Sequence, residues 1–291
     1  MLRLVLALGL LCALPAAGQE LTGTMKKIKD SRAVVIGYRE SSFPFSYLNA
    51  AKRPIGYSID LCLEIVEEAK DTLGIDDLAV KYVPVNPDNR IDMVASGKVD
   101  LECGSTTSNR ERQKRVAFSP VIFVSGTKLM VRRPVKIRSY LDLAGKTVAV
   151  TSGTTNQAAM KVLSDKRKLD IRFVVAKDHA ASFSLVEQGK ADAFATDDVL
   201  LHGFIARSGR AKELAVVGDF LSYDPYGIMY RKDDPDFDAV VKSAFERLAT
   251  SRELEQIYNT WFLRPLPTGE RLNIAMSPQL REIFEILGLP Q

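Results

Sequence analysis

The feature that most constrains this fold is a pattern that occurs twice along the chain. Residues 91–102 read IDMVASGKVDLE, and residues 183–194 read FSLVEQGKADAF. Each copy has apolar residues at helical spacing, then Gly-Lys-x-Asp, and then a run typical of a strand. The glycines of the two copies, Gly97 and Gly189, are 92 residues apart. One such join between a helix and a strand is common, so the weight of this repeat depends on its surroundings.

The surroundings extend the repeat into two similar halves. AVVIGYRESS near residue 33 parallels TVAVTSGTTN near residue 147, because each is an apolar β run that ends in a polar loop before a helix. Each half therefore reads as β, loop, helix, β, helix, β, loop, helix. This alternation predicts α/β units with largely parallel strands, whose ligand sites lie at the carboxyl ends of the strands.

The segment 99–112, VDLECGSTTSNRER, predicts an anion-binding group at one such strand end. A strand reaches Gly104, hydroxyl side chains follow, and Ser108 with Glu111 predicts a capping box that starts a helix. Arg112 adds a planar guanidinium group that can hold a carboxylate or a phosphate with two hydrogen bonds. A capped surface helix with a chance arginine is the alternative interpretation of this segment taken alone.

The second half places hydroxyl groups and an acid at the matching strand ends. They are Thr151, Ser152, Thr154, Thr155 and Asp197. With the offset of 92 residues, Ser105 of the first half falls opposite Asp197. We therefore expect two similar lobes whose loops face each other with charges of opposite sign.

The N-terminus has the layout of a secretory signal. Arg3 precedes an apolar run over residues 4–14, and small residues follow at Ala16 and Gly18. This layout predicts a signal peptide over residues 1–18 that is cleaved after Gly18. The apolar run is shorter than the roughly 20 residues that a membrane-spanning helix needs, and no later segment is long and apolar enough. We expect an exported mature chain of one large or two small domains.

Composition argues against several functional classes. The chain has 40 basic and 36 acidic residues, a formal net charge of +4, and these charges are mixed along the sequence, so we expect no nucleic acid partner. The mature part keeps two cysteines, Cys62 and Cys103, and two histidines, His179 and His202. Since neither histidine is near a cysteine in sequence, we expect no metal site, no Cys/His nucleophile and no cofactor. In an oxidising compartment the two cysteines form a candidate disulfide, with two free thiols as the alternative.

Seven segments resemble the solute-binding proteins of bacterial ABC transporters. In chain order they are GYRESSFPFSY (37–47), GYSIDLC (56–62), NRIDMVASGKVDLECGSTTSNRERQKRVAFS (89–119), VAVTSGTTN (148–156), AKDHAASF (176–183), ADAFATDD (191–198) and YGIMYRKDDPDF (226–237). The resemblance is to the family that binds polar amino acids, and within it to members that bind glutamate and aspartate. It implies the α/β fold of type II periplasmic binding proteins, in which two αβ sandwich lobes are joined by two hinge strands.

The resemblance also implies a division of the chain and a cellular role. Lobe 1 would comprise residues 19–124 plus 229–291, and lobe 2 would comprise residues 125–228. The hinge crossings would fall near residues 123–131 and 223–231. By the same resemblance, the protein would be a periplasmic monomer that closes on its ligand and delivers it to a membrane ABC permease.

Matched position by position, the resemblance predicts a pocket for an amino acid with an acidic side chain. The residues that match the family's ligand contacts are, for the α-carboxylate, Arg112, Thr107 and Thr155; for the α-ammonium, Asp197 and Ser105; and for the side chain, Arg39, Arg90 and His179. A neutral amino acid needs one cation and one anion, which Arg112 and Asp197 supply. The two remaining arginines favour a second carboxylate on the ligand, because unpaired buried guanidinium groups are costly. We therefore expect L-glutamate or L-aspartate, since glutamine or asparagine would leave that charge poorly compensated.

Two positions depart from the family pattern. Pro87 stands where some members that bind acidic amino acids have a serine or threonine, so one side-chain contact is lost. Ile228 stands where some members have the cysteine that pairs with the cysteine of the ECG sequence, here Cys103. This departure makes Cys62 the candidate partner of Cys103.

An enzyme is the main rival interpretation. Cyclohexadienyl or arogenate dehydratases use the same two-lobed fold, and a fold alone does not determine a function. Such an enzyme needs a general acid near a leaving group, and Glu40, Glu102 and Asp198 are candidates. The amino acid site explains the polar residues without further assumptions, so we expect a binding protein without catalytic residues. A sensor ectodomain or a chemoreceptor accessory protein is a third interpretation.

Overall fold

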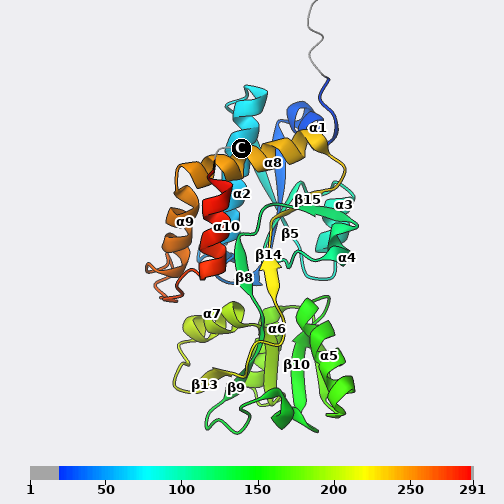
Figure 1. The fold of residues 1–291 in the computed structure, drawn as a ribbon, viewed down its shortest axis with the longest axis vertical. Helices are drawn as coiled ribbons and strands as arrows, with labels where there is room; N and C mark the ends of the chain where they lie inside the picture. Colours follow the sequence, from blue (N-terminus) through cyan, green and yellow to red (C-terminus); the bar gives the residue numbers. More distant parts are fainter. Residues whose placement is uncertain (1–19, 290–291) are drawn as a thin grey trace, which may run out of the picture.

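The computed structural model describes residues 20–289, and the predicted signal peptide over residues 1–18 lies outside this range. The described chain forms two lobes, which follow one another along the longest axis of the molecule (Figure 1). Each lobe contains a five-stranded sheet with helices packed against it. In the described residues, no helix is long and apolar enough to span a lipid bilayer.

The sheet of the first lobe combines strands from both ends of the chain. Its strands are β1 (Ala33–Tyr38), β5 (Ala79–Pro84), β6 (Leu101–Cys103), β7 (Val116–Phe118) and β15 (Met229–Arg231). They are ordered β5-β1-β6-β15-β7, with β1 parallel to β5 and β6, and β15 antiparallel to β6 and β7. A separate small sheet is formed by β2 (Ser41–Ser42), β3 (Ser46–Leu48) and β4 (Pro54–Ile55).

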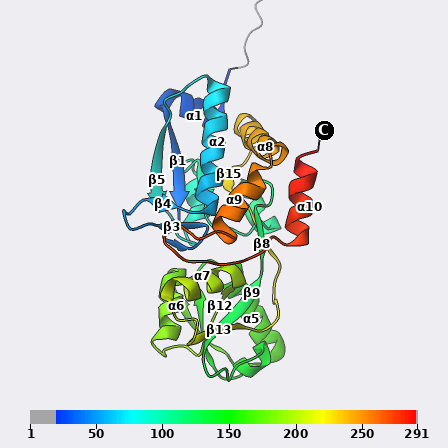
Figure 2. The ribbon, with the colours of Figure 1, turned by 90° about the vertical axis from the view of Figure 1, so that its left-hand side faces the viewer.

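The helices of the first lobe include a long C-terminal group. They are α1 (Gly23–Ser31), α2 (Tyr57–Leu73), α3 (Arg90–Ala95), α4 (Arg110–Gln113), α8 (Pro235–Thr250), α9 (Glu253–Phe262) and α10 (Pro278–Leu287). α2 packs on the sheet, α8 and α9 pack on α2, and α10 packs on α8 (Figure 2). Phe237, Val241 and Phe245 of α8 are fully buried, as expected for the apolar face of an amphipathic helix.

The second lobe repeats this plan with a continuous piece of chain. Its strands are β9 (Thr127–Arg132), β10 (Thr147–Thr151), β11 (Arg172–Ala176), β12 (Ala193–Asp197) and β13 (Leu214–Val217), ordered β11-β10-β12-β9-β13. The helices are the 3-10 helix η1 (Tyr140–Leu143), α5 (Thr155–Arg167), α6 (His179–Glu187) and α7 (Asp198–Ser208). β10 is parallel to β11 and β12, whereas β9 is antiparallel to β12 and β13.

The 92-residue repeat of the sequence corresponds to equivalent strands of the two sheets. β6 begins at Leu101 and β12 at Ala193, which are 92 residues apart. β6 lies parallel to β1, with Ile36 beside Leu101, and β12 lies parallel to β10, with Val148 beside Ala193. The expectation of largely parallel strands is correct, because four of the five strands in each sheet run in the same direction. In each sheet the fourth strand, β15 or β9, is antiparallel, because the chain enters it directly from the connection between the lobes.

That connection consists of two short antiparallel strands. β8 (Phe123–Ser125) pairs with β14 (Asp224–Tyr226), and both run between the lobes (Figure 1). Phe123 lies beside Tyr226, and Ser125 lies beside Asp224. These strands coincide with the expected hinge crossings, while the exact lobe limits at residues 124 and 229 stay a prediction.

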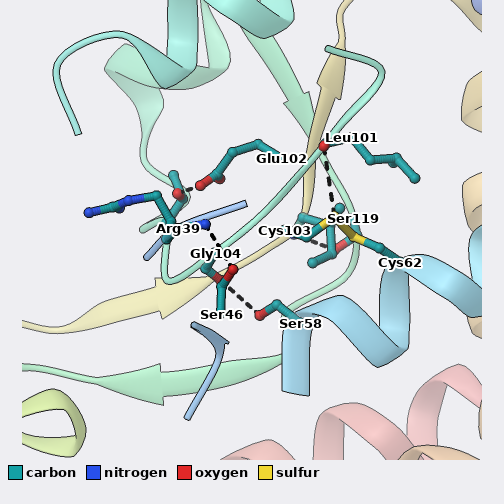
Figure 3. The surroundings of a disulfide bond; sticks show 11 residues. Arg39, Ser46, Ser58, Cys62, Leu101, Glu102, Cys103, Gly104 and Ser119 are labelled. Atoms are coloured by element: carbon teal, nitrogen blue, oxygen red, sulfur yellow. Dashed lines mark hydrogen bonds between the residues drawn. A yellow bond between two sulfur atoms is a disulfide. The ribbon is translucent and has the colours of Figure 1, made fainter. Parts of the chain in front are cut away.

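A disulfide joins Cys62 of α2 to Cys103 at the end of β6 (Figure 3). The Cα atoms of these residues are 6.3 Å apart. Nearby, Ser58 of α2 donates a hydrogen bond of 2.8 Å to the carbonyl oxygen of Gly104. The disulfide and this hydrogen bond therefore attach the end of β6, which precedes the predicted binding residues, to α2.

Candidate functional site

The candidate site lies where loops of the two lobes touch. Thr107 Oγ1, which follows β6, lies 3.3 Å from Thr155 Oγ1 at the start of α5. Ser152 Oγ of the second lobe donates a 2.8 Å hydrogen bond to Asp88 of the first. The carboxyl ends of β6 and β10 thus face each other, as expected for ligand sites in α/β folds.

Arg112 reaches across this contact from α4. Its Nη1 donates to the carbonyl oxygen of Thr107 at 2.8 Å, and its Nη2 donates to the carbonyl oxygen of Gly153 in the second lobe at 3.3 Å. Burial, followed by the positive charge of Arg90, lowers the pKa of Arg112 to about 9. The guanidinium group therefore remains positively charged at neutral pH in a largely buried position.

The predicted capping box of α4 is wrong by one residue. The helix begins after Asn109, whose side chain accepts a 3.0 Å hydrogen bond from the backbone N–H of Arg112. Ser108 Oγ instead accepts from the side chain of Gln113. Since α4 has only four residues, its N-terminus offers little to an anion, and the side chain of Arg112 is the cationic group at this strand end.

Asp197 ends β12 and is buried against the hinge. Its Oδ1 accepts a 2.9 Å hydrogen bond from Asn156, and its Oδ2 accepts a 2.5 Å hydrogen bond from the hydroxyl of Tyr226. Burial and the negative charge of Asp224 raise the pKa of Asp197 to about 7. The neighbouring Asp198 accepts from Ser125 Oγ at 2.6 Å, and Asp197 makes no side-chain cap to α7. A cation placed beside Asp197 would favour its ionised form.

Arg39, Arg90 and His179 form a second, positively charged end of the site. All three are buried, with at most 3% of each residue exposed. Both terminal nitrogens of Arg39 and Nε of Arg90 have no hydrogen-bond partner among residues 20–289. Burial, then the charges of Arg39 and Arg90, keep the pKa of His179 well below its usual value. His179 is therefore neutral at pH 7, and its Nδ1 lies 3.0 Å from Thr151 Oγ1.

The structure adds a buried acid to this end, Glu102 in the middle of β6. Its Oε2 accepts a 2.6 Å hydrogen bond from Thr106, whose hydroxyl also accepts one from Nη1 of Arg90. Figure 3 shows Glu102 near Arg39 and Gly104. A Cβ atom on Gly104 would collide with Glu102 Oε1 and with Cγ of Arg39, so a larger residue here would displace these side chains.

Glu102 corrects the charge argument made from the sequence. That argument counted Arg39 and Arg90 as unpaired, and it considered Glu102 only as a general acid of a rival enzyme. Burial lowers the pKa values of both arginines, and that of Arg39 falls to about 9. The negative charge of Glu102 acts in the opposite direction and raises both pKa values. The signal that could have revealed this role is the charge of Glu102 within the apolar strand β6, which is fully buried. Buried acidic residues are nearly always paired with a positive charge.

The remaining predicted residues also lie at the contact between the lobes. Ser105 is buried, and its hydroxyl has no hydrogen-bond partner among the described residues. Thr107 donates to Asp224 of the hinge at 3.2 Å. A cavity of about 330 Å³ lies beside Arg39 and is lined from the second lobe by Lys177 and Asp178. The eight predicted binding residues therefore gather around one region between the lobes.

Comparison with known proteins identifies the family. Residues 34–264 match the bacterial extracellular solute-binding proteins, family 3. The chain belongs to this family. It is 42% identical over 276 residues to an L-glutamate/L-aspartate-binding protein of Pseudomonas aeruginosa, with 94% of this chain and 91% of the relative covered. It is 40% identical over 274 residues to a glutamate/aspartate import solute-binding protein of Escherichia coli K12, with 94% and 89% covered.

Solved structures of the same architecture support the fold of this family member. A mutant of ArgBP from T. maritima has a TM-score of 0.73 and 27% identity, and the match covers 82% of this chain and 99% of that one. An ancestral amino acid-binding protein, described as a precursor of cyclohexadienyl dehydratase, has a TM-score of 0.71 and 26% identity over 82% and 99% of the two chains. The chain thus has the type II periplasmic binding protein fold expected from its sequence.

Proposed function

We propose that this solute-binding protein captures L-glutamate or L-aspartate between its lobes in the periplasm and delivers it, as a monomer, to a membrane ABC permease. The observation that carries the proposal is a pair of buried guanidinium groups, Arg39 and Arg90, with nitrogen atoms that lack a partner within residues 20–289. Leaving buried donors unpaired is costly, and a carboxylate is the group that guanidinium nitrogens bind best. The names of the two relatives above agree with this ligand class.

The other end of the site suits the main-chain groups of an amino acid. Arg112 would bind the α-carboxylate, with the hydroxyls of Thr107 and Thr155, which approach each other from the two lobes. Asp197 would bind the α-ammonium together with Ser105, whose buried hydroxyl lacks a partner among the described residues. These groups supply one positive and one negative charge, as an amino acid zwitterion requires.

The side chain of the ligand would then extend toward Arg39 and Arg90. The neutral imidazole of His179 offers Nε2 as a further polar contact, since its Nδ1 lies beside Thr151. A ligand that contacts groups of both lobes stabilises the closed arrangement, and closure is the usual response of two-lobed binding proteins.

We propose binding without chemical turnover. Of the acids named for a dehydratase, Glu40 is exposed, Asp198 is bonded to Ser125, and Glu102 is bonded to Thr106 beside the arginines. A general acid needs access to a leaving group, and the carboxylates of Asp198 and Glu102 are already hydrogen-bonded to hydroxyl groups of the protein. Release of product from prephenate or arogenate by the purified protein would contradict this part of the proposal.

The proposal is tested by calorimetry on protein that has been unfolded, freed of ligand and refolded with its disulfide intact. We expect L-glutamate or L-aspartate to bind at one site per chain, and L-glutamine and L-asparagine to bind at least 100-fold more weakly, or about 2.7 kcal/mol. Tight binding of glutamine without binding of either acid would contradict the assignment of the charged end. Size-exclusion chromatography with light scattering tests the monomer.

A further inference from the structure

The ligand contacts proposed above do not involve Glu102, and they do not explain why an acidic residue is buried in the site. Glu102 is completely buried in β6, at the positively charged end of the site. One carboxylate oxygen is held through Thr106 to Arg90, and the other has no hydrogen-bond partner in residues 20–289. An ionised carboxylate is strongly disfavoured in such a place unless positive charges face it. Arg39 and Arg90 are those charges.

Glu102 changes the net charge of the positively charged end of the site from the value that Arg39 and Arg90 give alone. Two guanidinium groups and one carboxylate leave a single net positive charge. Asp178, the next acid that acts on Arg39, is partly exposed and caps α6 through the N–H of Ala181, so water screens its charge. A ligand side chain that brings one carboxylate therefore balances this end, whereas an amide leaves one buried positive charge.

We infer that Glu102 is a positioning residue that also sets specificity: it holds Arg90 through Thr106 and neutralises one of the two guanidinium charges, so that the site is matched to a ligand with one side-chain carboxylate. This inference rests on the proposed function. It assigns Glu102 no contact with the ligand, because its effect acts through the two arginines.

The test measures selectivity, which a merely structural role does not change. We define the acid preference as the dissociation constant for L-glutamine divided by that for L-glutamate, measured by calorimetry at pH 7.5. Glu102→Gln keeps the shape and removes the negative charge, so we expect the acid preference to rise at least tenfold. Glu102→Asp keeps the charge, and we expect its acid preference to stay within threefold of the wild type. An unchanged or lower preference in Glu102→Gln would overturn the inference.

A second pair of variants tests the charge balance directly. In Arg39→Gln the charges of Arg90 and Glu102 cancel, so we expect the acid preference to fall to within threefold of one. In the double variant Arg39→Gln with Glu102→Gln one positive charge returns, and we expect the preference to rise at least tenfold above that of Arg39→Gln. This double variant removes one charge of each sign, so it carries the test if Glu102→Gln alone does not fold. Failure of the second substitution to restore the preference would contradict the charge balance.

The two proposals fail in different ways. If the wild type binds none of the four amino acids, the proposed function is wrong. If the wild type prefers glutamate but the preference does not respond to Glu102, only the role of Glu102 is wrong.

Discussion

Arg207 of the second lobe lies over the ring of Tyr47 in the first lobe, with its guanidinium carbon 5.0 Å from the ring centroid. The same group lies 5.2 Å from the ring centroid of Phe43 and 3.8 Å from a carboxylate oxygen of Glu270. Glu270 belongs to the segment between α9 and α10, which passes along the boundary of the lobes beside α7 (Figure 2). These contacts join the lobes on the side of α7 and favour the closed arrangement.

We predict that Arg207→Ala weakens binding of L-glutamate by about two- to fivefold. A cation that stays partly exposed over an aromatic ring, as Arg207 does, contributes about 0.5–1 kcal/mol. A smaller closed population lowers the apparent affinity in proportion. Arg210→Ala is the matched control, because Arg210 pairs with Glu187 and Glu213 of its own lobe. Calorimetry on both variants checks the prediction, and an equal loss in the two variants would count against a role of Arg207 in closure.

The two ends of the site should respond differently to loss of an arginine. Arg112→Ala removes the partner of the α-carboxylate, so we expect the loss of binding for acids and amides alike. Arg90→Gln should weaken acids by at least 100-fold, about 2.7 kcal/mol, while it changes amide binding far less. If both variants lost all four amino acids equally, the assignment of the two ends would be wrong.

Binding should depend on pH through Asp197. Its pKa is raised to about 7 by burial and by Asp224, so the carboxyl group takes up a proton as the pH falls below 7. The ligand ammonium requires the ionised carboxylate, and binding therefore releases a proton in this range. We predict that the affinity for L-glutamate falls by up to tenfold per pH unit between about pH 7 and pH 5.

Two controls separate this effect from others. The side chain of the ligand stays ionised above about pH 5. Burial and the charges of Arg39 and Arg90 lower the pKa of His179, which disfavours its protonation as the pH falls. Asp197→Asn should bind weakly and lose the pH dependence. A flat affinity profile in the wild type between pH 5 and pH 7 would contradict the role of Asp197.

The disulfide between Cys62 and Cys103 should stabilise the first lobe. It links residues 41 positions apart, and removal of a bond that closes such a loop costs about 2–5 kcal/mol. We predict a lower free energy of unfolding by that amount for the double variant Cys62→Ala with Cys103→Ala in urea titrations. Reductant should destabilise the wild type and leave the double variant unchanged. The same response to reductant in both proteins would show that the bond is absent in solution.

Local patterns in the sequence predicted the parts of the fold that depend on neighbouring residues. The repeat around Gly97 and Gly189 located β6 and β12, because helix, turn and strand signals all lie within a few residues. The antiparallel direction of β15 and β9 follows from the route of the chain through the hinge, which no local pattern records. The start of α4 was misplaced because Ser108 and Asn109 are both good capping residues in adjacent positions.

In the candidate site too, local sequence patterns predicted some residues, and others depend on contacts between distant parts of the chain. Arg112 and Asp197 were found because they lie at or just beyond the carboxyl ends of strands, one in each sheet. Glu102 was not assigned to the site, since a single acid within an apolar run does not reveal which charges face it. The contact of Arg207 with Tyr47 depends on residues 160 positions apart in the sequence, and only the packing of the two lobes brings them together.

The most direct test of the account is a crystal structure of the refolded protein with L-glutamate. We predict that the ligand lies between the lobes with its α-carboxylate on Arg112, its ammonium on Asp197 and its side-chain carboxylate within hydrogen-bond distance of Arg39 and Arg90. A ligand bound in the reverse orientation, or outside the contact between the lobes, would contradict it.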